Sequence, residues 1–220
     1  RCLSQALDNP TRPFTAVVGG AKVSSKIGVL ENLLDKVDNM IIGGGMAYTF
    51  VKANGGKIGN SICEDDQLDV ARAIEKKAQE KGVKLVMATD VLVTDDFSGN
   101  GTNKFVKINE IPDGFEGVDA GLESRIAFAE VLKNSKTILM NGPVGAFENP
   151  KFAEGTKAVL KAIVEATKNG ATSVIGGGDS VSAAKKFCKA EDFTHVSTGG
   201  GASLEFIEGK ILPGVAALDD

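Results

Sequence analysis

The sequence is poor in the residue types that several classes of functional site require. Its 220 residues include no tryptophan, one histidine and three cysteines. Without His195 no Ser/His/Asp or Cys/His arrangement can be built, and because this histidine lies in an apolar stretch we interpret it as structural. The cysteines are far apart and form no C-x-x-C pair, which disfavours disulfides and zinc and is typical of a reducing compartment. They are Cys2, Cys63 and Cys188.

Positive charge and long apolar runs are also scarce. The formal net charge is -4 at pH 7, and the few arginines form no basic stripe of the kind found in nucleic-acid-binding proteins. No apolar segment approaches the roughly 20 residues that cross a bilayer. We therefore expect neither a nucleic acid nor a membrane as a partner. The arginines are Arg1, Arg12, Arg72 and Arg125.

The length is sufficient for one large domain or two small ones with a full hydrophobic core. The chain begins at Arg1, without a methionine, within a stretch of helical character at 2–9. We therefore expect the chain to be a fragment, so that a targeting segment would lie outside it.

Glycine-rich turns repeatedly follow apolar runs, and all but one of them lead directly into a stretch of helical character. Glycine lets the backbone approach a phosphate, and a helix N-terminus offers unpaired N–H groups with a favourable dipole. The recurrence predicts that one edge of a sheet holds a large, phosphate-rich ligand. The turns lie at 17–22, 41–45, 139–143, 174–179 and 196–201.

Apolar strands alternate with amphipathic helices along the chain. We predict an α/β fold, a Rossmann-like parallel sheet with helices on both faces in a three-layer α/β/α sandwich, with ligands beyond the carboxyl ends of the strands. The region 95–121 reads as a long excursion with one short strand at 104–108. Strands are predicted at 14–18, 39–42, 84–94 (with a bend near Asp90), 137–140, 172–175 and 195–197. Helices are predicted at 23–37, 46–53, 61–81 (opened by the capping-box pattern Ser61-x-x-Glu64), 122–134, 151–168, 180–189 and 202–208.

The familiar phosphate-binding motifs are absent. The chain contains no P-loop pattern, and Asp96-Phe97-Ser98 only resembles a protein-kinase signature. The dinucleotide fingerprint requires a third glycine, and a larger residue stands at each corresponding position. We therefore expect a nucleotide site assembled from several turns. The residues at the failed third positions are Tyr48, Val181 and Leu204.

Lys22 and Lys26 follow the first glycine turn and lie four apart, on one face of the first turn of a predicted helix. Two cations there oppose the positive end of the helix dipole, at a cost of roughly 0.3–1 kcal/mol each. An anion held between these lysines and the N–H groups of Gly19 and Gly20 would attract both cations, and this attraction would offset their unfavourable interaction with the dipole. The alternative interpretation is a pair of solvated surface lysines.

Two carboxylates admit both a plain and a functional interpretation. Asp179 follows three glycines at a predicted helix start, where it would act as an N-cap, bind Mg²⁺ or do both. Ser180 beside it offers a hydroxyl and an N–H. Glu148 lies on a loop among small neighbours and, taken alone, reads as surface charge. Cys188 and Met140 are interpreted as core residues.

Taken in order, the glycine turns and the residues after them closely resemble phosphoglycerate kinase, from about Pro13 to the tail Leu212-Pro213-Gly214-Val215. The resemblance is to the C-terminal, nucleotide-binding half of that enzyme, and the basic N-terminal half has no counterpart in this sequence. The segments that carry it are 19–26, 42–47, 141–145, 176–180 and 197–205.

The resemblance implies a role for each matching residue. Lys22 would stabilise charge on the transferring phosphoryl group and Lys26 would contact the nucleotide phosphates. Gly178, in the phosphate and metal turn, and Gly201 would join Lys22 as catalytic residues. Gly200 and Gly201 would head the last helix, whose N-terminus would face the migrating phosphoryl group. Asp179 would bind Mg²⁺. The remaining nucleotide-binding residues would be Gly44, Gly45, Gly117 and Val118 around the adenine, Asn141, Gly142, Pro143 and Val144 beside the nucleotide, Glu148 on the ribose, and Gly177 and Ser180 at the phosphates.

The resemblance also implies an organisation and a reaction. Residues 1–13 would be the remnant of an interdomain helix or linker, and 14–220 the nucleotide-binding domain of a two-domain kinase. The parent enzyme would transfer a phosphoryl group between 1,3-bisphosphoglycerate and Mg-ADP, giving 3-phosphoglycerate and ATP, with Mg²⁺ as cofactor. It would be a cytoplasmic monomer, with an organellar form left open. Two alternatives are a stand-alone nucleotide-binding module without catalysis and a nicotinamide-dependent dehydrogenase.

Overall fold

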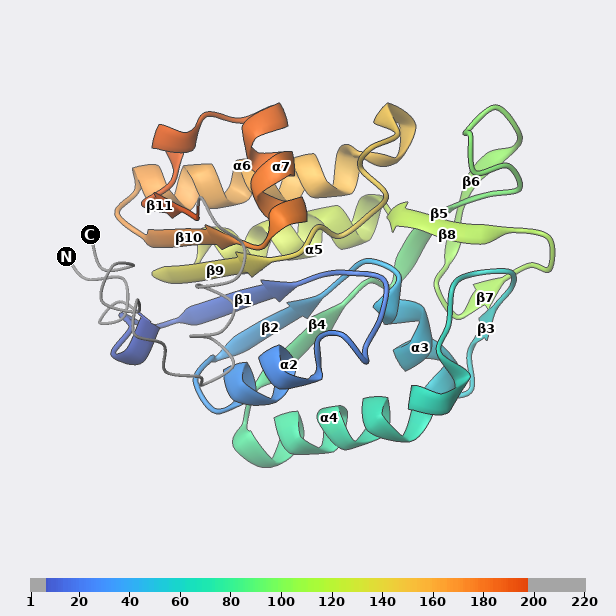
Figure 1. Cartoon of the computed structure of the whole chain (residues 1–220), viewed down its shortest axis with the longest axis horizontal. Coiled ribbons are helices and arrows are strands. Elements are labelled where there is room, and N and C mark those ends of the chain that lie inside the picture. The colour runs from blue at the N-terminus through green and yellow to red at the C-terminus, as the bar shows by residue number, and fades with distance from the viewer. Residues whose placement is uncertain (1–6, 198–220) are drawn as a thin grey trace.

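A computed structural model describes residues 7–197 as a three-layer α/β/α sandwich (Figure 1). The main sheet is parallel throughout, which confirms the predicted fold class. Its strands are β1 (Phe14–Val18), β2 (Asn39–Ile42), β4 (Lys84–Met87), β9 (Thr137–Asn141), β10 (Thr172–Gly176) and β11 (His195–Val196). They lie in the spatial order β11-β10-β9-β1-β2-β4. The central strand β1 is buried along its whole length because helices cover both faces.

Alternating side chains of the central strands face two separate cores. Val18 and Ile42 pack with one set of helices, and Val17 and Ile41 pack with the other. The first set, below the sheet in Figure 1, comprises α2 (Ile27–Leu34), α3 (Met46–Ala53) and α4 (Leu68–Lys81). The second set, above the sheet, comprises α5 (Leu122–Lys133), α6 (Glu154–Lys168) and α7 (Gly178–Phe187). No helix within residues 7–197 combines the length and the apolar character needed to cross a membrane.

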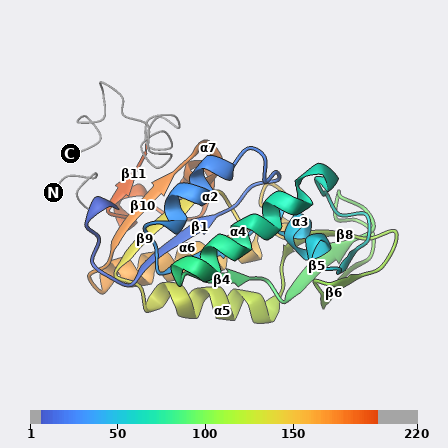
Figure 2. The same ribbon diagram turned by 90° about the horizontal axis from the view of Figure 1, so that it is seen from below.

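Short strands form two side sheets at one end of the molecule, beyond the carboxyl ends of the main strands (Figure 2). The first is antiparallel, with β5 (Asp90–Thr94) between β6 (Asn103–Lys107) and β8 (Glu116–Ala120). The second pairs β3 (Lys57–Ile58) with β7 (Glu110–Ile111). Single 3₁₀ turns complete the described elements, at η1 (Asp65–Gln67), η2 (Pro150–Phe152) and η3 (Ala190–Asp192).

The carboxylate of Asp90 fastens the antiparallel side sheet to the body of the domain. It accepts hydrogen bonds from the backbone N–H groups of Glu123 and Ser124 (3.0 and 2.9 Å), in the first turn of α5. Burial raises the pKa of Asp90, but these bonds and one from the Ser124 hydroxyl outweigh it, so the pKa lies below its usual value. A helix N-terminus therefore holds β5 in place.

The predicted strand over 84–94 is two strands in different sheets, and the predicted excursion contains β6, β7 and β8 rather than one strand. The chain leaves the main sheet after Met87. There the N–H groups of Thr89 and Asp90 donate to the Ser124 hydroxyl (3.0 and 3.2 Å), which turns the backbone away. A single apolar run therefore supplies both sheets.

The predicted capping box Ser61-x-x-Glu64 is wrong, since α4 begins only at Leu68, after η1. Both side chains are engaged by other segments. The Ser61 hydroxyl accepts from the N–H of Gly117 (2.9 Å), and the Glu64 carboxylate accepts from Ser24. Tertiary contacts thus replace the local cap. Elsewhere the predicted elements shift by a few residues: 151–168 divides into η2 and α6, 180–189 begins at Gly178, and 202–208 lies outside the described residues.

Candidate functional site

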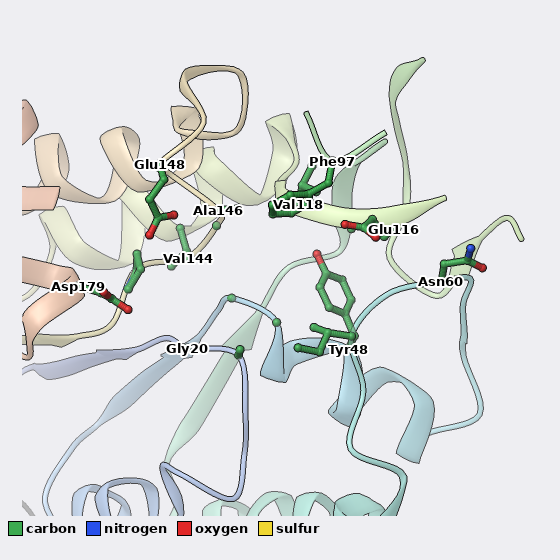
Figure 3. A pocket seen from close by; sticks show the side chains of 17 residues that line it. Gly20, Tyr48, Asn60, Phe97, Glu116, Val118, Val144, Ala146, Glu148 and Asp179 are labelled. Atoms are coloured by element: carbon green, nitrogen blue, oxygen red, sulfur yellow. The ribbon is translucent and has the colours of Figure 1, made fainter. Parts of the chain in front are cut away.

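A cavity of about 400 Å³ lies where the carboxyl ends of the main strands meet the antiparallel side sheet (Figure 3). Glu148 and Asp179 lie at one end of it, and Asn60 and Glu116 at the other, with Tyr48 pointing toward β8 between them. The residues from the main-sheet turns are Gly20, Ala21, Gly44, Gly45, Pro143, Val144, Gly145, Ala146, Glu148 and Asp179. Those from the remaining segments are Tyr48, Asn60, Ile62, Phe97, Glu116, Gly117 and Val118.

The turns after β1 and β9 are in direct backbone contact, and only glycine allows this. A Cβ on Gly19 would lie 1.9 Å from the carbonyl oxygen of Pro143, and one on Gly142 would lie 2.2 Å from the carbonyl oxygen of Gly19. Gly142 also has a φ of +111°, which L side chains rarely adopt. These glycines therefore bring the two turns of the site together.

A second close approach shapes the cavity on the side of β8. A Cβ on Gly117 would lie 2.1 Å from the phenol oxygen of Tyr48. The Tyr48 ring is buried in the wall, and burial raises its pKa, as do the negative charges of Asp119 and Glu116. Tyr48 is therefore a neutral phenol at physiological pH and contributes no charge to this wall.

Of the residues predicted at the phosphates and the metal, Asp179 lines the cavity, whereas Lys26, Gly177 and Ser180 lie beside it. Asn141, at the end of β9, is fully buried, and its Oδ1 accepts a hydrogen bond from the Lys26 ammonium. Its Nδ2 has no hydrogen-bond partner within residues 7–197. The same amide lies about 3.5 Å from the Cβ position of Gly177, the N-cap of α7. An unpaired donor thus adjoins a helix N-terminus.

Ser180 has a structural role that the sequence does not reveal. Its side chain is fully buried, and its hydroxyl accepts a hydrogen bond from the N–H of Gly142. The turn after β9 is therefore fixed to α7 by this bond.

The prediction that Lys22 and Lys26 lie on the first turn of a helix is wrong, because α2 begins only at Ile27. Residues 21–26, called here the lysine loop, form a tight turn instead. The Ser25 hydroxyl donates to the Lys22 carbonyl (2.9 Å) and the Lys26 N–H donates to the Val23 carbonyl (2.9 Å). Such local serine bonds compete with helix formation. Lys22 is exposed, whereas Lys26 is half-buried at the N-cap of α2.

Asp179 is not an N-cap, since Gly177 takes that position and no side chain caps α7. Its carboxylate is exposed in the first turn of α7 and lines the cavity. Within residues 7–197 no three His, Cys, Asp or Glu side chains gather closely enough to hold a metal. Mg²⁺ at phosphates is usually held by one or two carboxylates together with phosphate oxygens. The donor set at Asp179 therefore fits such an ion only if a phosphate supplies further ligands.

The structure brings together many of the predicted site residues. Gly44, Gly45, Gly117, Val118, Pro143, Val144, Glu148 and Asp179 line the cavity. Lys26, Asn141, Gly142, Gly177, Gly178 and Ser180 form the adjoining turn around the N-terminus of α7. Lys22 contributes to neither group, and Gly201 lies outside the described residues. His195 is half-buried in the edge strand β11. Met140 is fully buried in the core, as predicted. Cys188, also predicted in the core, is half-buried and packs against the same core cluster.

Several cavity residues were missed because their segments carry no recognisable motif. Ile62 and Phe97 are 47% and 58% exposed, although both are large and apolar, and an exposed apolar residue on a loop is the signal that could have found them. The Phe97 ring packs against Phe152 with centroids 6.0 Å apart. The other missed residues are Ala21, Tyr48, Asn60, Glu116, Gly145 and Ala146.

Asp119, whose carboxylate is fully buried behind the cavity wall, was also missed. Its oxygens accept hydrogen bonds from the N–H groups of Ala120 and Gly155 (both 2.9 Å), and it pairs with Arg125 at 3.2 Å. Burial raises the pKa of Asp119 to about 6, against the opposing effect of these partners. Because Gly155 lies in the first turn of α6, Asp119 ties the cavity wall to that helix.

A family model described as phosphoglycerate kinase matches residues 1–210. The chain belongs to the phosphoglycerate kinase family. The phosphoglycerate kinase of Coxiella burnetii is 45% identical with a TM-score of 0.92, and the match covers 99% of this chain and 56% of that one. The enzyme of Pyrococcus horikoshii OT3 is 30% identical with a TM-score of 0.78, over 97% of this chain and 53% of that one. The chain therefore spans about half the length of these two relatives.

Membership in the phosphoglycerate kinase family confirms the resemblance that the ordered glycine turns indicated. The likeness to the solved phosphoglycerate kinases also agrees with the parallel sheet and its covering helices. The roles of individual residues and the division at residue 13 stay predictions.

Proposed function

We propose that this chain binds Mg-ADP and Mg-ATP and forms the nucleotide-binding half of a phosphoglycerate kinase. Family membership supports the reaction class. The observation that best supports nucleotide binding is the side-chain amide of Asn141. Its Nδ2 is buried and has no hydrogen-bond partner among the described residues. A buried unpaired donor costs roughly 1–3 kcal/mol, which a phosphate oxygen would relieve.

The phosphates would lie at the N-terminus of α7. Its free N–H groups and dipole favour an anion, and Gly177 and Gly178 let the anion approach. Lys26 is held at the same place by Asn141 and supplies positive charge. These groups come from different turns, which explains why no single phosphate motif is present.

The adenine would occupy the cavity next to this turn. Its walls are largely apolar, with Ile62, Val118 and Val144 facing the space, and a planar base fits such a slot. Glu148 would accept hydrogen bonds from ribose hydroxyls, and its position in the lining near Asp179 supports this role (Figure 3).

Asp179 would be the protein ligand of Mg²⁺, which when bound would neutralise charge on the nucleotide phosphates. In the proposed reaction, the bond between the acyl oxygen of 1,3-bisphosphoglycerate and phosphorus breaks. A bond forms between that phosphorus and a β-phosphate oxygen of ADP, so the carboxylate of 3-phosphoglycerate leaves. Lys22, together with Gly178 at the N-terminus of α7 and with Gly201, would stabilise the transferring group without any covalent intermediate.

We further propose that a separate N-terminal domain binds the phosphoglycerate, and that 1–13 is the remnant of the linker to it. The uncovered share of both relatives leaves room for such a domain. The parent enzyme would be a cytoplasmic monomer, with an organellar form left open. The isolated chain would bind nucleotide with little or no turnover, because domain closure is needed to join the substrates and exclude water.

Calorimetric titration of the chain with ADP, with and without Mg²⁺, tests the nucleotide proposal. We expect ADP to bind at least about tenfold more tightly than NAD, because the chain lacks the dinucleotide fingerprint. Asp179→Asn should abolish the gain that Mg²⁺ gives. Asp66→Asn is the matched control, because its exposed side chain makes no hydrogen bond or ion pair within the described residues. Tighter NAD binding would overturn the proposal in favour of a dehydrogenase.

A turnover assay with 1,3-bisphosphoglycerate and ADP tests the proposal that the isolated chain transfers phosphoryl groups slowly or not at all. A rate near that of an intact phosphoglycerate kinase would contradict the need for a second domain. If a longer natural form of the chain binds ADP but never transfers phosphoryl groups, a stand-alone nucleotide-binding module becomes the better interpretation.

Phe97→Ala should weaken both adenosine and ADP binding by about fivefold, since stacking of a base on an aromatic ring contributes roughly 1–3 kcal/mol and this ring is half exposed. Phe105→Ala is the control, because Phe105 is similarly exposed (45%) but does not line the cavity. Equal affinities for wild type and Phe97→Ala would place the base elsewhere.

A further inference from the structure

The segment 60–64 touches both halves of the proposed nucleotide site. Asn60 and Ile62 line the cavity proposed for the base. Two residues later, Glu64 contacts the lysine loop, which carries Lys22 and Lys26. A single short segment therefore connects the base cavity to the loop that bears the phosphate-binding cations.

The Glu64 carboxylate holds the lysine loop chiefly by accepting two hydrogen bonds from Ser24. Its Oε2 accepts from the Ser24 hydroxyl at 2.5 Å, and its Oε1 accepts from the Ser24 N–H at 3.1 Å. The N–H of Glu64 in turn donates to the hydroxyl of Thr49 (3.1 Å), which is fully buried in α3. The loop is thus fastened through Glu64 to a helix of the core.

The carboxylate is charged at neutral pH. Burial raises the pKa of Glu64, but hydrogen bonds from Ser24 and Val23 and the nearby charge of Lys22 outweigh it, so the pKa lies below its usual value. A negative charge next to the lysine loop disfavours a phosphate by electrostatics alone. If the Glu64 carboxylate favours phosphate binding, it must therefore do so through its hydrogen bonds to the lysine loop and not through its charge.

We propose that Glu64 is a positioning residue that holds the lysine loop in the conformation in which Lys26 reaches Asn141, beside the proposed nucleotide phosphates. This inference rests on the proposed nucleotide-binding function. The two effects of Glu64 have opposite signs. Loss of its charge alone would strengthen ADP binding, whereas loss of its hold on Ser24 would weaken it.

Three variants separate these effects by calorimetry with ADP and with adenosine, in the presence of Mg²⁺. Glu64→Ala removes the charge and the hydrogen bonds, so we expect ADP affinity to fall about five- to tenfold, with adenosine affinity within about twofold of wild type. Glu64→Gln keeps acceptor and donor atoms for Ser24 without the charge, so its ADP affinity should equal or exceed that of wild type. Asp66→Asn removes a charge two residues away and should change neither.

Amide hydrogen exchange of Val23 to Lys26 without nucleotide gives a readout independent of ligand. Glu64→Ala should raise exchange in this loop selectively, and Glu64→Gln should restore protection. Unchanged or tighter ADP binding by Glu64→Ala, or equal loss of ADP and adenosine affinity with a general rise in exchange, would overturn the positioning role. If wild type fails to bind ADP, the proposed function fails, and the exchange result alone decides whether Glu64 holds the loop.

Discussion

Asp119→Ala is expected to lower the free energy of unfolding by about 3–5 kcal/mol at pH 7, because removing one partner of a buried ion pair leaves the other uncompensated. The Arg125 side chain is only 14% exposed, and that of Asp119 is not exposed at all. The substitution also removes the acceptor for the N–H of Gly155 in α6. Denaturant unfolding followed by circular dichroism measures the loss.

Two control variants define the origin of that loss. Asp119→Asn keeps the volume and an acceptor oxygen, so its loss at pH 7 should be smaller than that of alanine. Asp66→Asn removes an exposed charge and should lie within about 0.5 kcal/mol of wild type. A loss for Asp119→Ala no larger than that for Asp66→Asn would show that the buried pair contributes nothing to stability.

The pH dependence of the same unfolding reaction tests the raised pKa of Asp119. Because the pKa is about 6 in the folded chain and near 3.8 in the unfolded one, the folded state retains a proton between these values that the unfolded state has released. Stability then falls as pH rises through this window. Relative to Asp119→Asn, wild type should lose up to about 3 kcal/mol between pH 4 and 7. A rise over the same range would contradict the burial argument.

Gly142→Ala is expected to cost about 3–5 kcal/mol of stability, since it adds backbone strain to a steric overlap. The φ of +111° is unfavourable for alanine, and the new Cβ would lie 2.2 Å from the carbonyl oxygen of Gly19. The turn must move, and with it Asn141 and the bond to Ser180. We therefore also expect ADP affinity to fall at least tenfold, measured by calorimetry under conditions where the variant is folded.

Gly170→Ala is the matched control for this prediction. Its φ of +104° is nearly the same, but no atom lies within 4 Å of the added Cβ. It should therefore show only the conformational cost, roughly 1–2 kcal/mol, with unchanged ADP affinity. If the two variants lose the same stability, the close approach of the turns has no energetic consequence.

Much of the main sheet follows from local sequence. The strand at Phe14–Val18 and the helix at Met46–Ala53 have the predicted bounds, because apolar periodicity and the flanking glycines are short-range signals. The cavity residues of the glycine turns, such as Gly44 and Pro143, were also predictable, since carboxyl ends of parallel strands share one edge.

The residues that failed prediction share a physical cause. Ser61 and Glu64 have the spacing of a capping box, but each side chain bonds to a distant segment, and no side chain caps η1 or α4. Asp179 follows a glycine turn at a helix start, yet Gly177 with its positive φ takes the cap position. A local sequence pattern indicates which hydrogen bonds a side chain is able to form, and the packing of distant segments determines which of them it does form.

The sequence by itself determined the fold class, the edge of the sheet at which the candidate cavity lies and the family to which the chain belongs. The fold class and that edge rest on glycine conformation and strand periodicity, which act over a few residues, whereas the family rests on the resemblance that the glycine turns carry when they are taken in order. Only the tertiary structure decided that Phe97 and Ile62 face the cavity, that Asp119 is buried behind it, and that Glu64 holds the lysine loop. Those contacts join segments far apart in the chain, and they form because the buried core brings the segments together.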